Sequence, residues 1–418
     1  MDISIIELFS GIGAQYQALK NANFDIKSIA TCEIDKDAML SYSIMHNDLT
    51  KEKLETYQFP TKEEMINYLS KKNIGFDFKK NIPYNWTRLN IQKIKEYYLA
   101  SILSKNLGDI SKVDSLPQAD LWTYSFPCQD ISVAGKMQGI VKGQTRSGLL
   151  YEVERLLDTS NHKPKYLLLE NVKNLVGKNF KPQFDLWIQK LDQLGYHTYY
   201  QVLNAKNFGI PQNRERVFAL SIRKDLNQSY QFPQNQKLTS TVLDYLEENI
   251  PEKYYLKNKN VEKLLNELFK TNQLNENKSI SDSTIYKPKI KNISNCITAR
   301  YNSGIQKKQS IGTVVIEPKI DILMKIPEWR QRGFIYNTHG VLGCLAATDY
   351  KTPKLILDGY QVRKLTPKEC LRLMGFPDEK IDKLIEYKIS DMQLYKQAGN
   401  SIVVNVLTAI FKELLTIL

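Results

Sequence analysis

The sequence is poor in residues that bind metal ions. It contains 5 cysteines and 4 histidines in 418 residues, with no CxxC pair and no HExxH motif. Neither a structural nor a catalytic zinc site is therefore expected, and we predict no metal. The cysteines are odd in number and widely scattered, which argues against a disulfide framework and for a reducing compartment.

Long apolar runs are missing as well. None approaches the roughly 20 residues that span a bilayer. The first residues, MDISIIELFSG, predict a strand entering a glycine turn instead of a secretion signal. These absences predict a soluble, cytoplasmic protein without a membrane partner.

Acidic residues are outnumbered by basic ones. Lys and Arg total 58 and Asp and Glu total 45, which gives a net charge of +13. This excess favours a polyanionic partner, because each phosphate that a protein neutralises releases condensed counterions. A basic surface that only promotes solubility explains the same excess, so charge alone leaves both readings open.

Short β-rich runs alternate with helical patterns in the first half of the chain, as an α/β parallel sheet requires. In open sheets of this kind, ligands bind beyond the carboxyl ends of the strands. We therefore predict a doubly wound α/β domain whose site lies at that edge. The expected strands are residues 3–9, 29–33, 121–125, 166–170 and 217–222, and their ends carry Phe9-Ser10-Gly11, Glu33, Cys128 and Glu170-Asn171.

Three other segments have their own character. Residues 46–106 have a mostly helical pattern and predict an inserted helical layer, for which packing is favoured over DNA contact. From residue 223 onward Asn and Lys are abundant, which indicates a second domain. Residues 397–415 have an apolar stripe at helical spacing and predict a C-terminal helix capped by Asn400-Ser401.

The stretch SFPCQDIS at 125–132 places Cys128 beside these strand ends. A thiolate is a strong nucleophile once its proton is lost. A nearby carboxylic acid can hold a ring nitrogen, and an arginine can bind a carbonyl oxygen. Together these groups meet the needs of a pyrimidine ring that is attacked at C6 and then accepts a methyl group at C5.

Eight motifs, in order along the chain, resemble those of the cytosine-C5 DNA methyltransferases of bacteria and phages. They are ELFSGIG (7–13), CEIDKDA (32–38), GDIS (108–111), SFPCQDIS (125–132), ENVKNL (170–175), GIPQNRERVF (209–218), RKLTPKECLRLMGFP (363–377) and QAGNSIVVNV (397–406).

The resemblance implies a catalytic role for four residues. Cys128 would attack C6 of cytosine, and Glu170 would hold N3 and the exocyclic amine. Arg216, with Arg214 beside it, would bind O2 and organise the loop near Cys128. The other cysteines, at 32, 296, 344 and 370, are interpreted as packing residues.

The resemblance also implies S-adenosyl-L-methionine as the cofactor. Phe9 would pack against the sulfonium end and Glu33 would accept the ribose hydroxyls, while Asp109 and Ile110 would contact the adenine edge. The full implied cofactor set is Phe9, Gly11, Gly13, Glu33, Ile34, Asp109, Ile110, Pro127 and Asn400.

Double-stranded DNA is the implied substrate. A stacked cytosine is out of reach, so it must be flipped out of the helix, and the glycine-rich loop 130–148 would close over the DNA. Gln129, Ser132 and Arg146 are the expected DNA contacts. Where the family usually has Thr-Leu this chain has Cys344-Leu345, so no DNA contact is carried over there.

The implied architecture is a Rossmann-like methyltransferase domain, residues 1–222 completed by 390–418, with a smaller target-recognition domain at 223–389. The implied function is sequence-specific DNA cytosine-5 methylation, in a restriction–modification system or by an orphan enzyme. A monomer is expected, and any cognate restriction endonuclease would act separately. Two alternatives stay open. A tRNA methyltransferase of the same fold is disfavoured by the long recognition region, and an inactive DNA-binding regulator is disfavoured by the intact Cys128, Glu170 and Arg216.

Overall fold

The computed structural model describes most of the chain outside two long segments. The described residues are 1–77, 82–127, 146–255, 322–325, 334–336, 341–345, 347, 354–358 and 361–418.

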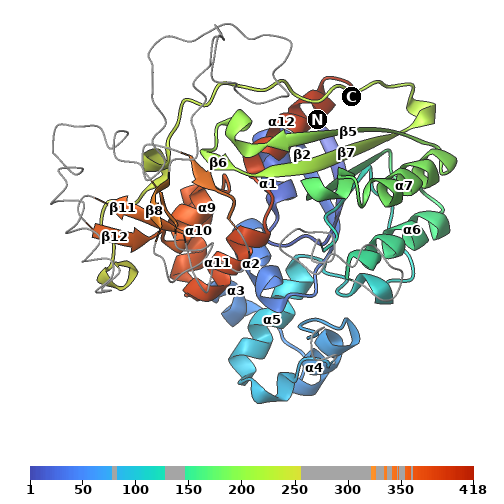
Figure 1. The fold of residues 1–418 in the computed structure, drawn as a ribbon. Coiled ribbons are helices and arrows are strands. Elements are labelled where there is room, and N and C mark those ends of the chain that lie inside the picture. Colours follow the sequence, from blue (N-terminus) through green and yellow to red (C-terminus); the bar gives the residue numbers. More distant parts are fainter. Residues whose placement is uncertain are drawn as a thin grey trace, which may run out of the picture.

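A six-stranded sheet forms the centre of the described structure, in the order β2-β1-β3-β4-β7-β5 (Figure 1). β1 to β4 run parallel, whereas β7 is antiparallel to both of its neighbours. The predicted doubly wound α/β fold is thus confirmed, with one reversed strand. The strands are β1 (Asp2–Leu8), β2 (Asp25–Cys32), β3 (Leu121–Tyr124), β4 (Tyr166–Val172), β5 (Tyr196–Asn204) and β7 (Glu215–Arg223).

The sheet is buried on both faces, because successive side chains of a strand point to opposite sides. In β3, Leu121 belongs to one apolar core, while Trp122 and Tyr124 belong to the other. The first core joins the sheet to α1 (Ala14–Asn21), α2 (Lys36–His46), α5 (Ile91–Leu103) and α12 (Val404–Leu415). The second joins it to α6 (Leu150–Thr159) and α7 (Lys181–Gln193), which lie on the other side in Figure 1.

The segment between β2 and β3 is helical. Besides α2 and α5 it contains α3 (Lys51–Thr56), α4 (Lys62–Lys71) and the short helix Trp86–Arg88. Thr61 caps the start of α4 with a capping box: its hydroxyl accepts from the Glu64 amide, and the Glu64 carboxylate accepts from the Thr61 amide. Met65 and Leu69 are buried and attach α4 to the first core.

The C-terminal prediction was wrong in one respect. Residues 397–415 are not one helix capped by Asn400-Ser401, because α11 (Asp391–Asn400) ends there and α12 begins at Val404. The residues between them are extended, and the Val404 amide donates to Met374 O at 2.9 Å. A backbone carbonyl from elsewhere in the fold therefore takes the place of the expected side-chain cap.

Among the described residues, one segment, Asp391–Leu415, is long and apolar enough to cross a membrane by length and composition. More than half of its most apolar window is buried inside the protein, and α12 contributes to the first core. This is how the core helix of a globular domain behaves.

The described parts of 223–389 form a small sheet and two helices. The sheet has the order β12-β11-β9-β8, and a short pair, β6 (Gln212–Asn213) and β10 (Leu342–Gly343), joins this region to the residues before β7. Lys383 of α10 forms an ion pair with Asp48, which lies two residues beyond the end of α2, and Lys383 Nζ is 2.8 Å from Asp48 Oδ1. The domain boundary at 223–389 stays a prediction. The elements are β8 (Ile322–Lys325), β9 (Phe334–Tyr336), β11 (Leu355–Asp358), β12 (Gln361–Lys364), α9 (Pro367–Arg372) and α10 (Asp378–Glu386).

Candidate active site

Glu170 and Arg216 form an ion pair at the edge of the sheet. Glu170 lies near the end of β4 and Arg216 near the start of β7, and the antiparallel pairing brings these two ends together. The Nε atom of Arg216 is 3.3 Å from Glu170 Oε1. Ser125, just after β3, donates its hydroxyl to Glu170 Oε2 at 3.0 Å. The carboxylate is 8% exposed and held from two strands.

The two residues before Cys128 are anchored beside this pair. Asn171 donates from Nδ2 to Phe126 O at 3.0 Å, and Ser147 donates its hydroxyl to Pro127 O at 2.7 Å. Cys128 itself, with Gln129 and Ser132, lies outside the described residues, and of Arg146 only the backbone is described. The last described residue before Cys128, Pro127, is thus held close to Glu170.

Arg214 does a different job from Arg216. Its buried guanidinium donates to Leu345 O at 2.7 Å, to Ser401 O at 2.7 Å and to Gly399 O at 3.2 Å. Burial lowers the pKa of this guanidinium, and the charge of Arg216 lowers it further. These contacts join β7 to the C-terminal helices and to the Cys344-Leu345 segment. They support a positioning role, while the direct catalytic role of Arg214 stays a prediction.

Cys344 is a functional candidate that the sequence interpretation missed. Its Sγ lies 3.4 Å from Arg214 Nη1 and 3.9 Å from Arg216 Nη2. Burial raises the pKa of this thiol, but the two arginines outweigh burial and leave the pKa below its usual value. The signal was the Cys-Leu departure itself, although nothing in the sequence shows that the two arginines meet it. Cys32 and Cys370 are buried, as interpreted, and Cys296 lies outside the described residues.

The turn after β1 has unusual backbone geometry. Phe9 is left-handed (φ 61), and Gly11 follows with φ 55. The Phe9 and Ser10 amides both donate to Cys32 O, which fixes the turn to β2. A Cβ added to Gly11 would meet nothing within 4 Å, whereas one on Gly13 would lie 2.6 Å from the His46 ring. The open space is therefore at Gly11, and Gly13 is needed for packing against α2.

Glu33 closes the same turn from the end of β2. Its carboxylate accepts from the Gly11 amide at 2.9 Å and from the Asp35 amide at 2.7 Å. Burial raises the pKa of Glu33 to about 7, partly offset by these hydrogen bonds. Ile34, which follows, is partly exposed.

Asp109 and Ile110 lie in the turn after the helical insertion. Asp109 is buried, and its Oδ1 accepts from the amide and the hydroxyl of Ser111. Its Oδ2 accepts from Asn73 Nδ2 at 2.7 Å. Ile110 is buried in the second core beside the sheet. Asn400 is exposed at the end of α11.

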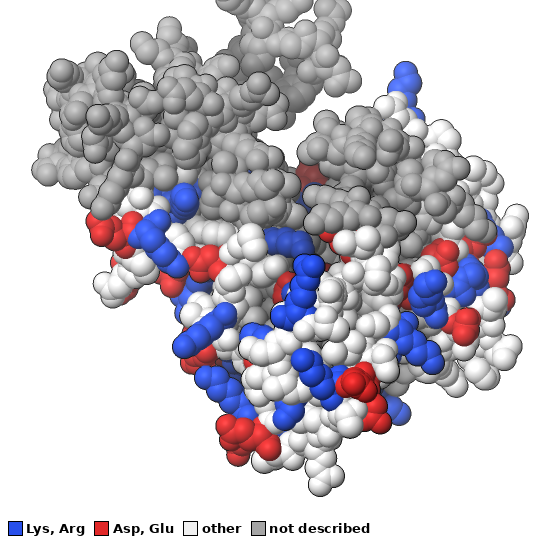
Figure 2. Space-filling model, turned by 90° about the horizontal axis from the view of Figure 1, so that it is seen from below, with Lys and Arg blue, Asp and Glu red and all other residues white. Residues whose placement is uncertain are grey.

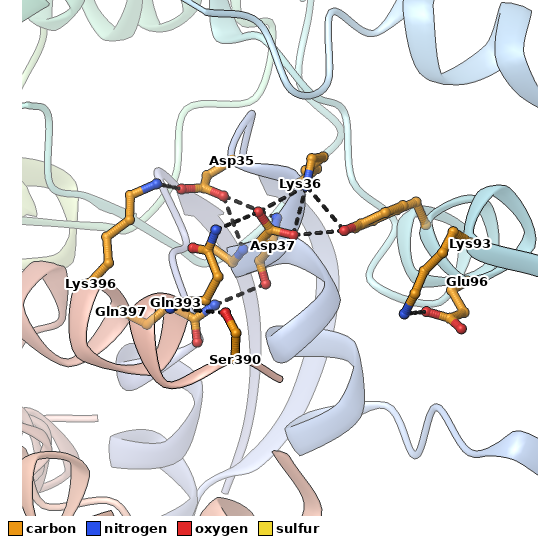
Figure 3. Close-up of polar contacts among 11 residues, drawn as sticks. Asp35, Lys36, Asp37, Lys93, Glu96, Ser390, Gln393, Lys396 and Gln397 are labelled. Atoms are coloured by element: carbon orange, nitrogen blue, oxygen red, sulfur yellow. Dashed lines mark hydrogen bonds and ion pairs between the residues drawn. The ribbon is translucent and has the colours of Figure 1, made fainter. Parts of the chain in front are cut away.

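Helix α11 is joined to the loop after β2 by a polar network (Figure 3). Lys396 pairs with Asp35 at 2.5 Å, and Gln393 donates to Asp37 Oδ2 at 2.9 Å. Asp35 is also the N-cap of α2, because its carboxylate accepts from the amides of Asp37 and Ala38. The C-terminal part of the chain therefore buttresses the edge at which Glu33 lies.

Charges of both signs are mixed on the surface. Figure 2 shows Lys and Arg interspersed with Asp and Glu over the described part of one face. The net charge of +13 is thus not gathered into one patch on the part of that face that is described.

Within the described ranges, no group of three or more His, Cys, Asp and Glu could hold a metal ion.

Comparison with known proteins identifies the family. A family model described as C-5 cytosine-specific DNA methylase matches residues 60–416. The chain is 40% identical over 416 residues to the type II methyltransferase M2.ScrFI of Lactococcus lactis subsp. cremoris, covering 99% of both chains. It is 32% identical over 424 residues to the orphan methyltransferase M.SssI of Spiroplasma monobiae, covering 99% of this chain and 97% of the relative.

The fold is also found among solved structures. The Dnmt2 methyltransferase of S. pombe superposes with a TM-score of 0.55 and 17% identity, over 99% of this chain and 98% of that one. This structural similarity agrees with the sheet order, and the two sequence matches cover nearly the whole chain. The chain belongs to the C-5 cytosine-specific DNA methylase family, and it is a DNA cytosine-5 methyltransferase.

Proposed function

We propose that this methyltransferase modifies one cytosine within a specific duplex DNA sequence, with Cys128 as nucleophile and S-adenosyl-L-methionine as methyl donor. The observation that carries the proposal is the Glu170–Arg216 pair beside the anchored residues Phe126 and Pro127. An acid, a guanidinium and the approach to a cysteine meet at one edge of the sheet, where β3 and β4 have their carboxyl ends and the antiparallel β7 begins. Open α/β sheets bind their ligands at the carboxyl ends of their parallel strands.

The residues of the β1–β2 edge fit the cofactor. Open space at Gly11 allows a ligand to approach the backbone, and Glu33 offers a carboxylate to ribose hydroxyls. Asp109 offers a second carboxylate to the adenine amine. When bound, S-adenosyl-L-methionine supplies an electrophilic methyl group to C5 of the target base. The other cofactor contacts are proposed on the resemblance of the motifs. They are Phe9, Gly13, Ile34, Ile110, Pro127 and the exposed Asn400.

Arg216 and Glu170 would grip the flipped cytosine from two edges. Glu170 would hold N3 and the exocyclic amine, which draws electron density from C6, and Arg216 would bind O2. The Cys128 thiolate would then form a bond to C6 and make C5 electron-rich. Once C5 carried the methyl group and S-adenosyl-L-homocysteine was left, water would accept the C5 proton, and the electron pair of the C5–H bond would re-form the C5–C6 double bond. The C6–sulfur bond would break in the same elimination and return the thiolate.

A trapping experiment tests this assignment. A duplex containing 5-fluorocytosine has no C5 proton to lose, so the enzyme with cofactor should remain covalently attached to it. We expect a denaturation-resistant adduct with the wild type and none with Cys128→Ser, whose folding is checked by its thermal melting. An adduct that persists in Cys128→Ser would show that another group is the nucleophile.

The substrate and the biological setting are tested separately. Tritiated cofactor should label duplex DNA and leave tRNA unlabelled, and label in tRNA alone would overturn the DNA assignment. Bisulfite sequencing of DNA from expressing cells should show methylation of one cytosine in one short sequence. We propose that the enzyme works as a cytoplasmic monomer. We also propose that it protects this sequence from a separate restriction endonuclease, in line with the relative that is named a type II methyltransferase. The relative named an orphan methyltransferase supports the alternative of an orphan enzyme.

A further inference from the structure

The end of α4 touches three of the segments that form the cofactor edge. Asp109 N donates to Lys72 O at 3.0 Å, and Gly75 N donates to Ile34 O at 2.6 Å. The Lys72 ammonium donates to Asn106 O. The helical insertion is therefore built into the adenine side of the site, although it lies between two of the motifs and contains none of them.

Asn106 connects this contact to Glu33. Its Oδ1 accepts from the Glu33 amide at 2.9 Å, and its Nδ2 donates to Glu33 O at 2.8 Å. The approach of the insertion is also close at Gly108, where an added Cβ would lie 2.1 Å from Lys72 O. Glu33 and Asp109 are thus held in one network by residues 72–75 and 106–108.

Asn73 makes the side-chain contact at the centre of this network. It is left-handed (φ 57), one residue beyond the C-cap Lys72 of α4, a position where asparagine is well tolerated. Its Nδ2 donates to Asp109 Oδ2 at 2.7 Å, while Ser111 occupies Oδ1. A carboxylate has about four lone-pair sites, so Oδ2 keeps one site for a second donor.

We propose that Asn73 is a positioning residue for the cofactor. It fixes the Asp109 carboxylate so that the remaining lone pair accepts the exocyclic amine of the cofactor's adenine. This gives the helical insertion a role in cofactor affinity, in place of DNA contact or simple packing. The inference rests on the proposed role of Asp109, and the experiment separates the two.

The test uses Asn73→Gly, because glycine keeps the left-handed backbone and removes only the amide. The matched control is Asn23→Gly. Asn23 is also left-handed (φ 64) and also follows a helix C-cap, that of α1, but it is exposed and lies before β2 begins. Calorimetry with S-adenosylhomocysteine measures binding without turnover, and steady-state kinetics separate KM for the cofactor from kcat.

We expect Asn73→Gly to weaken S-adenosylhomocysteine binding about tenfold, as for a lost hydrogen bond to a charged group. The KM for the cofactor should rise in parallel, with kcat and the KM for DNA unchanged, and Asn23→Gly should match the wild type. S-inosylhomocysteine, which lacks the amine, should bind the wild type and Asn73→Gly equally. In an Asp109→Ala background, Asn73→Gly should have no further effect.

Three results would overturn the inference. If Asp109→Ala weakens binding and Asn73→Gly does not, the cofactor site stands and Asn73 has no part in it. An equal loss in both Asn→Gly variants would show a general effect on stability. If Asp109→Ala binds as tightly as the wild type, the proposed cofactor contact is itself misplaced, and the role of Asn73 falls with it.

Discussion

At the scale of single residues, two arginines that are two positions apart have separate partners. Arg214 donates to backbone carbonyls from three distant positions, whereas Arg216 pairs with Glu170. Both lie near Cys344, which links the two sets of contacts. The sequence motif contains both residues but does not show that one donates to distant backbone carbonyls and the other pairs with Glu170.

Methionine substitutions should separate the two roles. Arg214→Met removes the guanidinium donor from three buried carbonyls, of which Leu345 O keeps the Cys344 thiol, so we expect a loss of about 2–4 kcal/mol of unfolding free energy. Arg216→Met should leave stability nearly unchanged and lower kcat about 10²- to 10³-fold, as for a lost charge-stabilising group. Urea unfolding and single-turnover methylation measure the two effects. A normal melting curve with a lost kcat in Arg214→Met would assign the catalytic role to Arg214.

Glu7 is a buried acid that the proposed chemistry does not use. Burial raises its pKa to about 7, although Tyr42 and the Tyr16 amide donate hydrogen bonds to it. The folded protein therefore keeps this proton at pH values where the unfolded chain, with a pKa near 4.5, has lost it. Stability should fall as pH rises from 4.5 to 7, by on the order of 3 kcal/mol.

The variant Glu7→Gln isolates this contribution. The unfolding free energy is measured in urea at pH 5 and pH 8 for both proteins, and the difference between them removes the titration of Glu33 and His46. We expect the wild type to lose stability relative to Glu7→Gln as the pH rises. Parallel pH profiles would show that Glu7 is ionised throughout.

At the scale of elements, one buried ion pair joins the small sheet β12-β11-β9-β8 to helix α9. Arg363 of β12 makes two hydrogen bonds of 2.8 Å to Glu369 of α9, and both side chains are almost fully buried. Glu369 also accepts from the Thr366 and Glu247 amides. The pair thus fixes the start of α9 and its position relative to β12.

Breaking this pair from one side should be costly. Glu369→Ala leaves the Arg363 guanidinium buried without its carboxylate counter-charge, and we expect a loss of about 3–5 kcal/mol in urea unfolding. Replacing both partners, as Arg363→Met with Glu369→Leu, should recover part of it, because no charge is then buried. If the double variant is no more stable than Glu369→Ala, the hydrogen bonds to Thr366 and Glu247, which both variants lack, are the main contribution of Glu369.

The parallel strands of the sheet were predictable from the sequence, whereas the contacts between distant elements were not. Strands β1 to β4 each contain a short β-rich run that is followed by polar residues, so their carboxyl edge could be expected. β5 has a tyrosine-rich pattern of mostly partly exposed residues and was not predicted. The break at residues 401–403 depends on the Met374 carbonyl, and the position of Cys344 depends on arginines 128 and 130 residues away in sequence. Local patterns carry no information about such partners.

At the scale of the whole molecule, the two ends of the chain complete one unit. α12 packs with α1 in the first core, and α11 is hydrogen-bonded to the loop after β2. The cofactor edge is thus braced by residues near the C-terminus and, through Asn73, by the insertion. The basic excess of the chain surrounds this unit as mixed charge, at least over the described part of the face in Figure 2.

The net charge of +13 predicts a strong salt dependence of DNA binding. Lys and Arg side chains that contact DNA phosphates displace condensed counterions, so the logarithm of the association constant should fall with that of the salt concentration, by about 0.9 per phosphate contacted. Six phosphate contacts would lower affinity about 10³-fold between 50 and 200 mM salt. Fluorescence anisotropy with a labelled duplex measures this slope, and S-adenosylhomocysteine binding, which involves no phosphate, provides the control. Equal slopes for the two ligands would mean that the net charge of +13 serves solubility and not DNA binding.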